Sequence, residues 1–65
     1  MNNVRRVAEI MRRGAAMGHR RWRMKQLVRR TGMGYTTVYD ALKLLEAQGV
    51  VENKSPEWVW KRPSK

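Results

Sequence analysis

Apolar residues recur at helical spacing at the start of the chain. Between residues 2 and 13 they form one stripe, and arginines occupy the opposite side. The stripe consists of Val4, Val7, Ala8 and Met11, and Ile10 widens it. This pattern predicts a helix over residues 2–13, whose first turn Asn2 or Asn3 can cap. The helix ends either at Gly14 or, if residues 15–17 extend it, at Gly18.

The pattern changes over residues 19–23, a segment too short and too charged for a helix. Trp22 stands between arginines there, as in a short strand with one buried face. A second helix should begin near Met24, with Leu27 on its apolar side. Arg23 occupies the N-cap position, so Gln26, three residues later, supplies only half of a capping box.

Two glycines then interrupt the helical pattern at Gly32 and Gly34, where a sharp turn would accommodate them. The pattern restarts at the spacing i, i+3, i+4 and i+7 with Val38, Ala41, Leu42 and Leu45. We therefore expect a third helix over residues 35–48, with Gly34 as its N-cap and Gly49 just past its end. Two short helices joined by a glycine-containing turn form a helix-turn-helix.

The last part of the chain changes from helical to strand-like composition. Residues 50–53 and 58–61 are rich in β-branched and aromatic side chains, and residues 54–57 between them contain Pro56. These features predict two strands joined by a hairpin loop, followed by a frayed basic tail at residues 62–65. The expected fold is a single α+β domain over residues 1–65, in the order helix, strand, helix, helix, strand, strand.

Three tryptophans are available to cover the small core. Trp58 and Trp60 alternate onto one face of the last strand, and Val59 points to the other. We expect these two and Trp22 to lie over the helices, because each can bury on the order of 200 Å². An exposed tryptophan beside the first helix would instead form a dimer patch, so a homodimer is a second hypothesis.

The charge of the chain favours a polyanionic partner. Its 65 residues carry a formal net charge of +10, and nucleic acid is the usual partner of such a protein. Residues 1–30 contain nine arginines and one lysine against Glu9 alone, whereas residues 31–65 nearly balance. A solvated basic surface that only maintains solubility is the alternative, although such surfaces usually mix both signs.

The sequence offers little for other classes of function. No apolar run approaches the roughly 18 residues of a membrane-spanning helix, and no secretory signal is visible, which favours a cytoplasmic protein. There is no cysteine and one histidine, His19, expected in an exposed loop. Neither a catalytic pair nor a phosphate-binding glycine loop is present, so we expect no enzyme, cofactor, metal or small-molecule effector.

Three segments together resemble the winged helix-turn-helix family of bacterial and archaeal transcription regulators. They are residues 22–27, residues 31–39 and residues 42–52, and the last is similar to the family's passage from recognition helix through glycine into the wing. The resemblance extends over about residues 4–61. It implies a mainly α domain with a small β-hairpin wing, and double-stranded DNA as the partner.

The resemblance implies that the third helix enters the major groove. The residues that would reach bases or the groove from its outward and flanking positions are Tyr35, Thr36, Thr37, Tyr39, Asp40 and Lys43. Thr36 and Thr37 could instead simply begin the helix, and Tyr39 could be buried against the second helix. Asp40 stands where related regulators commonly have a cation. It could accept from cytosine N4 or pair with a nearby basic residue.

Basic residues outside the third helix are the candidates for phosphate contact. They are Arg20, Arg21, Arg23, Lys25, Arg29, Arg30 and, as the one cation between two glutamates in the expected wing, Lys54. The exposed amides at the start of the second helix would add to this set. The four arginines of the first helix could contact DNA or simply be solvated.

The favoured hypothesis is a small transcriptional regulator that selects sites on double-stranded DNA. A winged helix that binds a protein or RNA remains open, because fold alone does not define function. A third alternative is an architectural protein that binds DNA without sequence preference.

Overall fold

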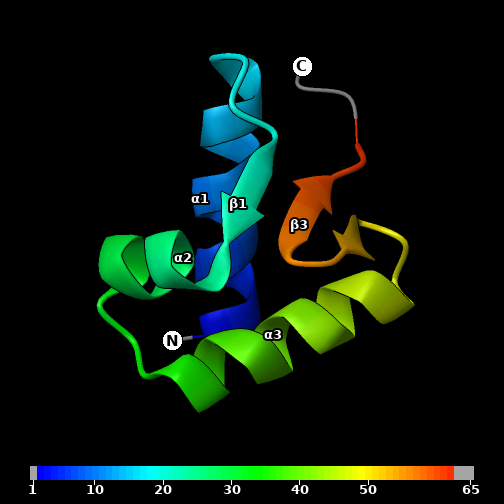
Figure 1. Ribbon diagram of the computed structural model, residues 1–65. Helices are drawn as coiled ribbons and strands as arrows, with labels where there is room; N and C mark the ends of the chain where they lie inside the picture. Colours follow the sequence, from blue (N-terminus) through cyan, green and yellow to red (C-terminus); the bar gives the residue numbers. More distant parts are fainter. Residues whose placement is uncertain (1, 63–65) are drawn as a thin grey trace.

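The computed structural model describes residues 2–62, which form three helices and a three-stranded antiparallel sheet (Figure 1). The elements are α1 (Asn3–Ala16), β1 (Arg21–Arg23), α2 (Met24–Thr31), α3 (Tyr35–Ala47), β2 (Val51–Lys54) and β3 (Glu57–Trp60). The α+β class and the order of the elements are confirmed. Of the expected tail, only Arg62 belongs to the described residues.

The first helix has the longer of its two predicted extents. Asn2 caps it, since its Oδ1 accepts from the backbone N–H groups of Val4 at 2.9 Å and Arg5 at 3.3 Å. The helix continues through Gly14 to Ala16, so an end at Gly14 is wrong. Trp22 explains the glycine there: a Cβ on Gly14 would lie 2.5 Å from Trp22 Cζ2.

The turn between α2 and α3 is held by one buried hydroxyl. Thr31 Oγ1 donates to the carbonyl of Leu27 at 2.7 Å and accepts from the Met33 N–H at 3.2 Å. Gly32 follows with φ +71°, the left-handed conformation in which glycine is favoured. At the other end of α2, Gln26 Oε1 accepts from the Arg23 N–H at 2.9 Å, which confirms the half capping box.

The sheet has the strand order β1-β3-β2. Trp22 of β1 pairs with Trp58 of β3, and Trp58 and Trp60 are buried while Val59 is half-buried. The alternation predicted for β3 is therefore confirmed. The predicted four-residue loop is wrong, because Lys54 pairs with Glu57 and only residues 55–56 form the turn. The two strands consequently begin and end one residue away from their predicted bounds.

One core lies between the three helices and the buried face of the sheet. The inward face predicted for α3, formed by Val38, Ala41, Leu42 and Leu45, is buried. It packs with Val7 and Met11 of α1 and with the three tryptophans, which are at most 4% exposed. A dimer patch built on an exposed tryptophan is therefore wrong, whatever the oligomeric state.

Candidate nucleic-acid interface

The outer side of α3 presents most of the predicted groove-contacting residues to solvent. Tyr35 is 61% exposed, Thr36, Asp40 and Lys43 are exposed as well, and Thr37 is half-buried. They are outside because the four apolar positions of the helix face the core. Leu44, 54% exposed on the same helix, was not predicted as a site residue. The predicted apolar stripe leaves position 44 off the buried side of the helix, so the pattern itself could have indicated its exposure.

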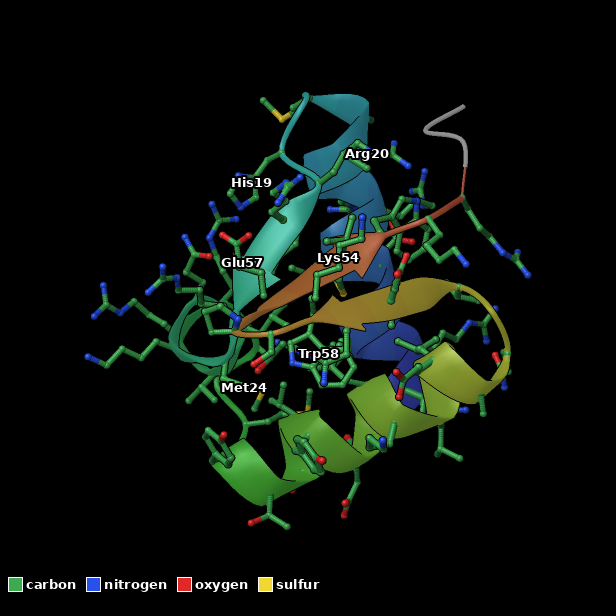
Figure 2. All side chains as sticks on the ribbon, turned by 45° about the vertical axis from the view of Figure 1, so that its right-hand side comes forward. His19, Arg20, Met24, Lys54, Glu57 and Trp58 are labelled. Carbon is green, nitrogen blue, oxygen red and sulfur yellow. The ribbon has the colours of Figure 1, made fainter. Side chains whose placement is uncertain are left out.

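Tyr39 packs against a different element from the one that the burial alternative named. Its ring lies 6.1 Å from that of Trp58, in an edge-to-face arrangement with an interplanar angle of 81°. Figure 2 shows Trp58 between the sheet and α3. The alternative of burial against α2 is therefore wrong: Tyr39 contacts β3 and remains 39% exposed. A hydroxyl at the edge of such a ring is still free to reach a ligand.

The charges on α3 are mostly engaged within the helix. Lys43 Nζ lies 3.1 Å from Glu46 Oε1, and this hydrogen bond raises the pKa of Lys43. Within the described part of the chain, Asp40 has no ion-pair partner, so the predicted alternative of pairing with a basic residue is wrong. The outer side of α3 thus has no excess of positive charge, and any attraction for a polyanion comes from its neighbours.

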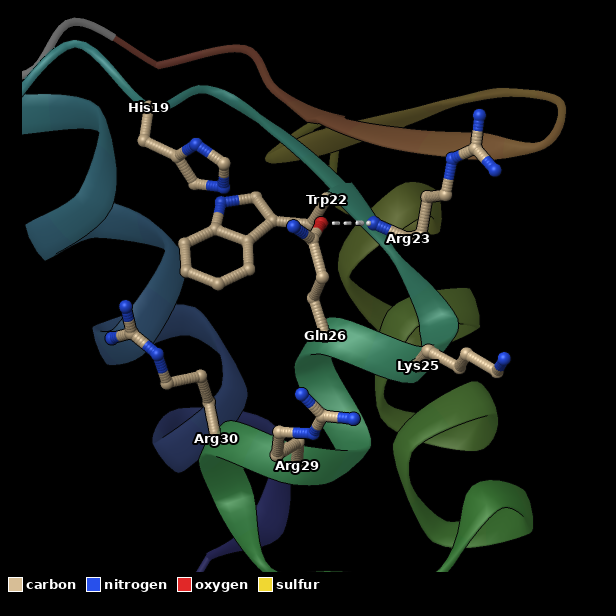
Figure 3. A pocket seen from close by; sticks show the side chains of 7 residues that line it. All are labelled: His19, Trp22, Arg23, Lys25, Gln26, Arg29 and Arg30. Atoms are coloured by element: carbon tan, nitrogen blue, oxygen red, sulfur yellow. Dashed lines mark hydrogen bonds between the residues drawn. The ribbon is translucent and has the colours of Figure 1, made fainter.

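A shallow groove between β1 and α2 gathers many of the predicted phosphate contacts (Figure 3). Its volume is about 470 Å³, and its cations are Arg23, Lys25, Arg29 and Arg30. All four side chains are exposed. The lining also includes His19 and Gln26, which sequence reasoning did not assign to the site. His19 is exposed as predicted, and its position over the groove arises from the fold, because β1 begins two residues later at Arg21.

Trp22 forms the floor of this groove. The His19 ring lies edge-to-face against the indole, with centroids 4.3 Å apart. The Arg30 guanidinium carbon lies over the same indole, 5.7 Å from its centroid. Such a cation–π contact restrains Arg30 without neutralising it. The groove therefore combines a rigid aromatic floor with cations that keep their charge.

Arg20 and Arg21, predicted as a pair of phosphate contacts, have different surroundings. Arg20 is half-buried, and its Nη2 donates to the carbonyls of Trp60 and Arg62, both at 2.8 Å. Figure 2 shows it beside the end of β3. Arg21 is exposed, and its Nη1 lies 3.3 Å from Glu57 Oε1. Arg20 thus holds the C-terminal strand to the β1 segment, a structural task that the sequence did not reveal.

The groove cations adjoin the start of α3. Lys25, Val28, Arg29 and Tyr35 line one shallow depression, so two α2 cations border the exposed ring of Tyr35. Lys54 is exposed beside the hairpin turn, in register with Glu57. The arrangement brings together the α2 cations and the N-terminal end of α3. Arg20 instead donates to the carbonyls of Trp60 and Arg62.

The remaining findings add no other kind of site. In residues 2–62 no helix is both long and apolar enough to cross a membrane. The same residues contain no group of three side chains able to hold a metal ion. Comparisons of the chain with protein-family models, with curated proteins and with solved structures found no match.

Proposed function

We propose that this chain is a double-stranded DNA-binding protein of the winged helix-turn-helix type, acting as a small transcriptional regulator. In this proposal α2 and α3 form the helix-turn-helix, and the β2–β3 hairpin is a short wing. The observation that carries the proposal is the shared depression lined by Lys25, Arg29 and Tyr35. It joins a strongly basic surface to the exposed beginning of α3.

The groove cations would hold the sugar-phosphate backbone. Arginine matches phosphate geometry with paired N–H donors, and lysine supplies a mobile point charge. Arg23, Lys25, Arg29 and Arg30 are all exposed, and none has a carboxylate partner in the described residues. Because no carboxylate of residues 2–62 neutralises these side chains, their full charge is available to phosphate groups. Phosphate contacts of this kind set affinity and register rather than sequence preference.

Base contacts would come from α3. Thr36 and Thr37 offer hydroxyls to bases or phosphates and methyl groups to thymine, and Tyr35 offers both a ring and a hydroxyl. Asp40, exposed and without an ion-pair partner in residues 2–62, would accept a hydrogen bond from cytosine N4. Leu44 adds an apolar contact that thymine methyl groups would satisfy. These residues would give the complex its sequence preference.

The composition of α3 also favours a second candidate function. Asp40 and Glu46 outweigh Lys43, and Leu44 is exposed. Such a surface also suits a protein partner, with the basic groove binding RNA or the backbone of DNA. An architectural protein without sequence preference would use the basic groove alone. All three functions share the fold and differ in what α3 contacts.

Competition binding separates these candidates. A labelled duplex, selected with the protein from a random library, would be displaced by unlabelled selected duplex, random duplex or RNA hairpin at several salt concentrations. The regulator requires the selected duplex to compete far better than the other two. Equal competition by random duplex would indicate an architectural protein. Preferred competition by RNA, or no duplex binding at all, would refute the proposed function.

A further inference from the structure

A second basic surface lies on the outer side of α1. It carries four arginines and one carboxylate, and we call it the α1 face: Arg5, Arg6, Glu9, Arg12 and Arg13. The Glu9 carboxylate accepts two hydrogen bonds from Arg12, at 2.7 and 3.0 Å, and one from Arg13 at 2.8 Å. These bonds, the Arg12 pair foremost, lower the pKa of Glu9 to about 2. One carboxylate thus organises two of the arginines and neutralises one charge.

Arg5 and Arg6 keep their charge. Both are exposed, and among the ion pairs of residues 2–62 neither takes part. Arg5, Arg6 and Arg13 border one open depression of about 590 Å³, together with Glu9 and Ile10. The α1 face is therefore an open surface of excess positive charge, formed by other residues than those of the β1–α2 groove.

The α1 face and the outer side of α3 point in different directions. The two helices pack against each other, with Val7 and Met11 of α1 and Val38 and Leu42 of α3 in one core. Figure 1 shows α3 crossing the N-terminal end of α1. Because each helix turns its apolar side toward the other, their exposed sides face away from each other. A straight duplex lying along α3 would not reach the α1 face.

We propose that the α1 face binds the sugar-phosphate backbone of a second duplex, so that one molecule connects two DNA segments. This inference rests on the proposed function, since α2 and α3 must hold the first duplex. Exposed guanidinium groups suit phosphate oxygens, which carry no sequence information. The second contact is therefore independent of sequence and strongly dependent on salt.

The buried side of α1 argues against a membrane surface as the occupant. A basic helix that lies on a bilayer must insert its apolar side among the lipids. Val7, Met11 and Ala15 are at most 4% exposed, because that side of α1 already packs in the core. The four arginines are exposed on the α1 face, Ile10 is half-buried beside them, and guanidinium groups match a polyphosphate chain better than an acyl layer.

A capture assay tests the inference with the intact chain. One duplex is fixed to beads, a fluorescent duplex is free in solution, and the protein is added at increasing salt. The test variant is Arg5→Gln/Arg6→Gln, which keeps helix propensity and removes two charges. The matched control, Lys25→Gln/Arg29→Gln, removes the same charge from α2. Circular dichroism checks that both variants fold.

We expect the wild type to bind the fixed duplex and capture the fluorescent one. The α1 variant should bind the fixed duplex nearly as well as the wild type, but it should capture less of the fluorescent duplex. The slope of log capture affinity against log salt concentration should fall by about 2 in magnitude, because two phosphate contacts disappear. The α2 control should lose binding and capture together. Equal capture by the α1 variant and the wild type would overturn the inference.

Two other results would also overturn it. The wild type could bind the fixed duplex without capturing a second one, which would leave the proposed function intact. Alternatively, the wild type could bind phosphatidylserine vesicles and the Arg5→Gln/Arg6→Gln variant fail to, while both proteins capture the second duplex equally. The α1 face would then be a membrane-surface contact. If the wild type bound no duplex at all, the proposed function itself would fail, and with it the basis of the inference.

Discussion

Trp22 connects three parts of the molecule at the scale of single residues. Its ring touches Gly14 of α1, the ring of His19 and the guanidinium of Arg30. The sequence predicted a buried Trp22 from its place between two arginines. It did not predict the contact with Gly14, because helical periodicity describes one segment and this contact joins two. For the same reason the end of α1 stayed open between two glycines.

The Gly14 contact predicts an unusual response to alanine. In most helices Gly→Ala stabilises by about 1 kcal/mol. Here the new Cβ would lie 2.5 Å from Trp22 Cζ2 and 3.0 Å from the His19 carbonyl oxygen. We expect Gly14→Ala to lower the free energy of unfolding by about 1–3 kcal/mol, measured in urea. In a Trp22→Phe background the loss should shrink. A more stable Gly14→Ala protein would show that the ring does not lie there.

Replacing Arg20 should lower stability without affecting the salt dependence of DNA binding, and replacing Arg21 should weaken DNA binding with little effect on stability. Arg20→Ala removes two hydrogen bonds from a half-buried guanidinium to the Trp60 and Arg62 carbonyls. We expect it to destabilise the fold by about 1–2 kcal/mol and to leave the salt slope of DNA binding unchanged. Arg21→Ala breaks only an exposed ion pair and should change stability by less than about 1 kcal/mol, while weakening DNA binding. The reverse pattern would contradict the assigned contacts.

Glu9 gives a pH dependence with a defined sign. Its pKa is lowered from 4.5 to about 2 by hydrogen bonds from Arg12 and Arg13. A carboxylate with a lowered pKa in the folded state stabilises above its unfolded pKa, and this contribution disappears as the pH falls toward 2. The melting temperature of the wild type should exceed that of Glu9→Gln at pH 7, and the difference should vanish near pH 2. A difference independent of pH would contradict this pairing.

At the scale of elements, local sequence patterns predicted the helices and strands better than they predicted which residues pair with each other. Periodicity identified all three helices of the described residues, and the inward side of α3 was right at each position. The hairpin was misjudged because Pro56 marks a turn but not its length, which the Lys54–Glu57 pairing decides. The Arg20 contacts join residues 40 and 42 positions apart, and no local pattern contains them.

Lys25 and Arg29 lie on the same helix, α2, so their joint contribution to DNA binding can be tested with one double variant. Lys25→Gln/Arg29→Gln should weaken binding to a duplex and lower its salt slope by about 2, through the loss of two phosphate contacts. Fluorescence anisotropy over a range of salt concentrations measures both effects. The matched control is Arg5→Gln/Arg6→Gln, whose effect on a single duplex should be small. Equal losses in both variants would indicate attraction by net charge alone.

At the scale of the whole molecule, the sequence predicted the class and the order of elements but not how its charge is divided. The excess of +9 in residues 1–30 was visible as one basic half. Folding separates it into the α1 face and the β1–α2 groove, and Glu9 neutralises part of the first. This division depends on which sides of α1 and α2 meet the core, which needs the packing of all six elements.

We propose that the outer side of α3, flanked by the α2 cations, contacts a duplex. Amide and side-chain chemical shifts of the isotope-labelled protein, titrated with the duplex selected from a random library, test it most directly. We predict the largest changes at Thr36, Asp40, Lys43, Lys25 and Arg29, with little change at Glu52 and Asn53 of β2. Binding that leaves residues 35–44 unperturbed would contradict a duplex contact through α3.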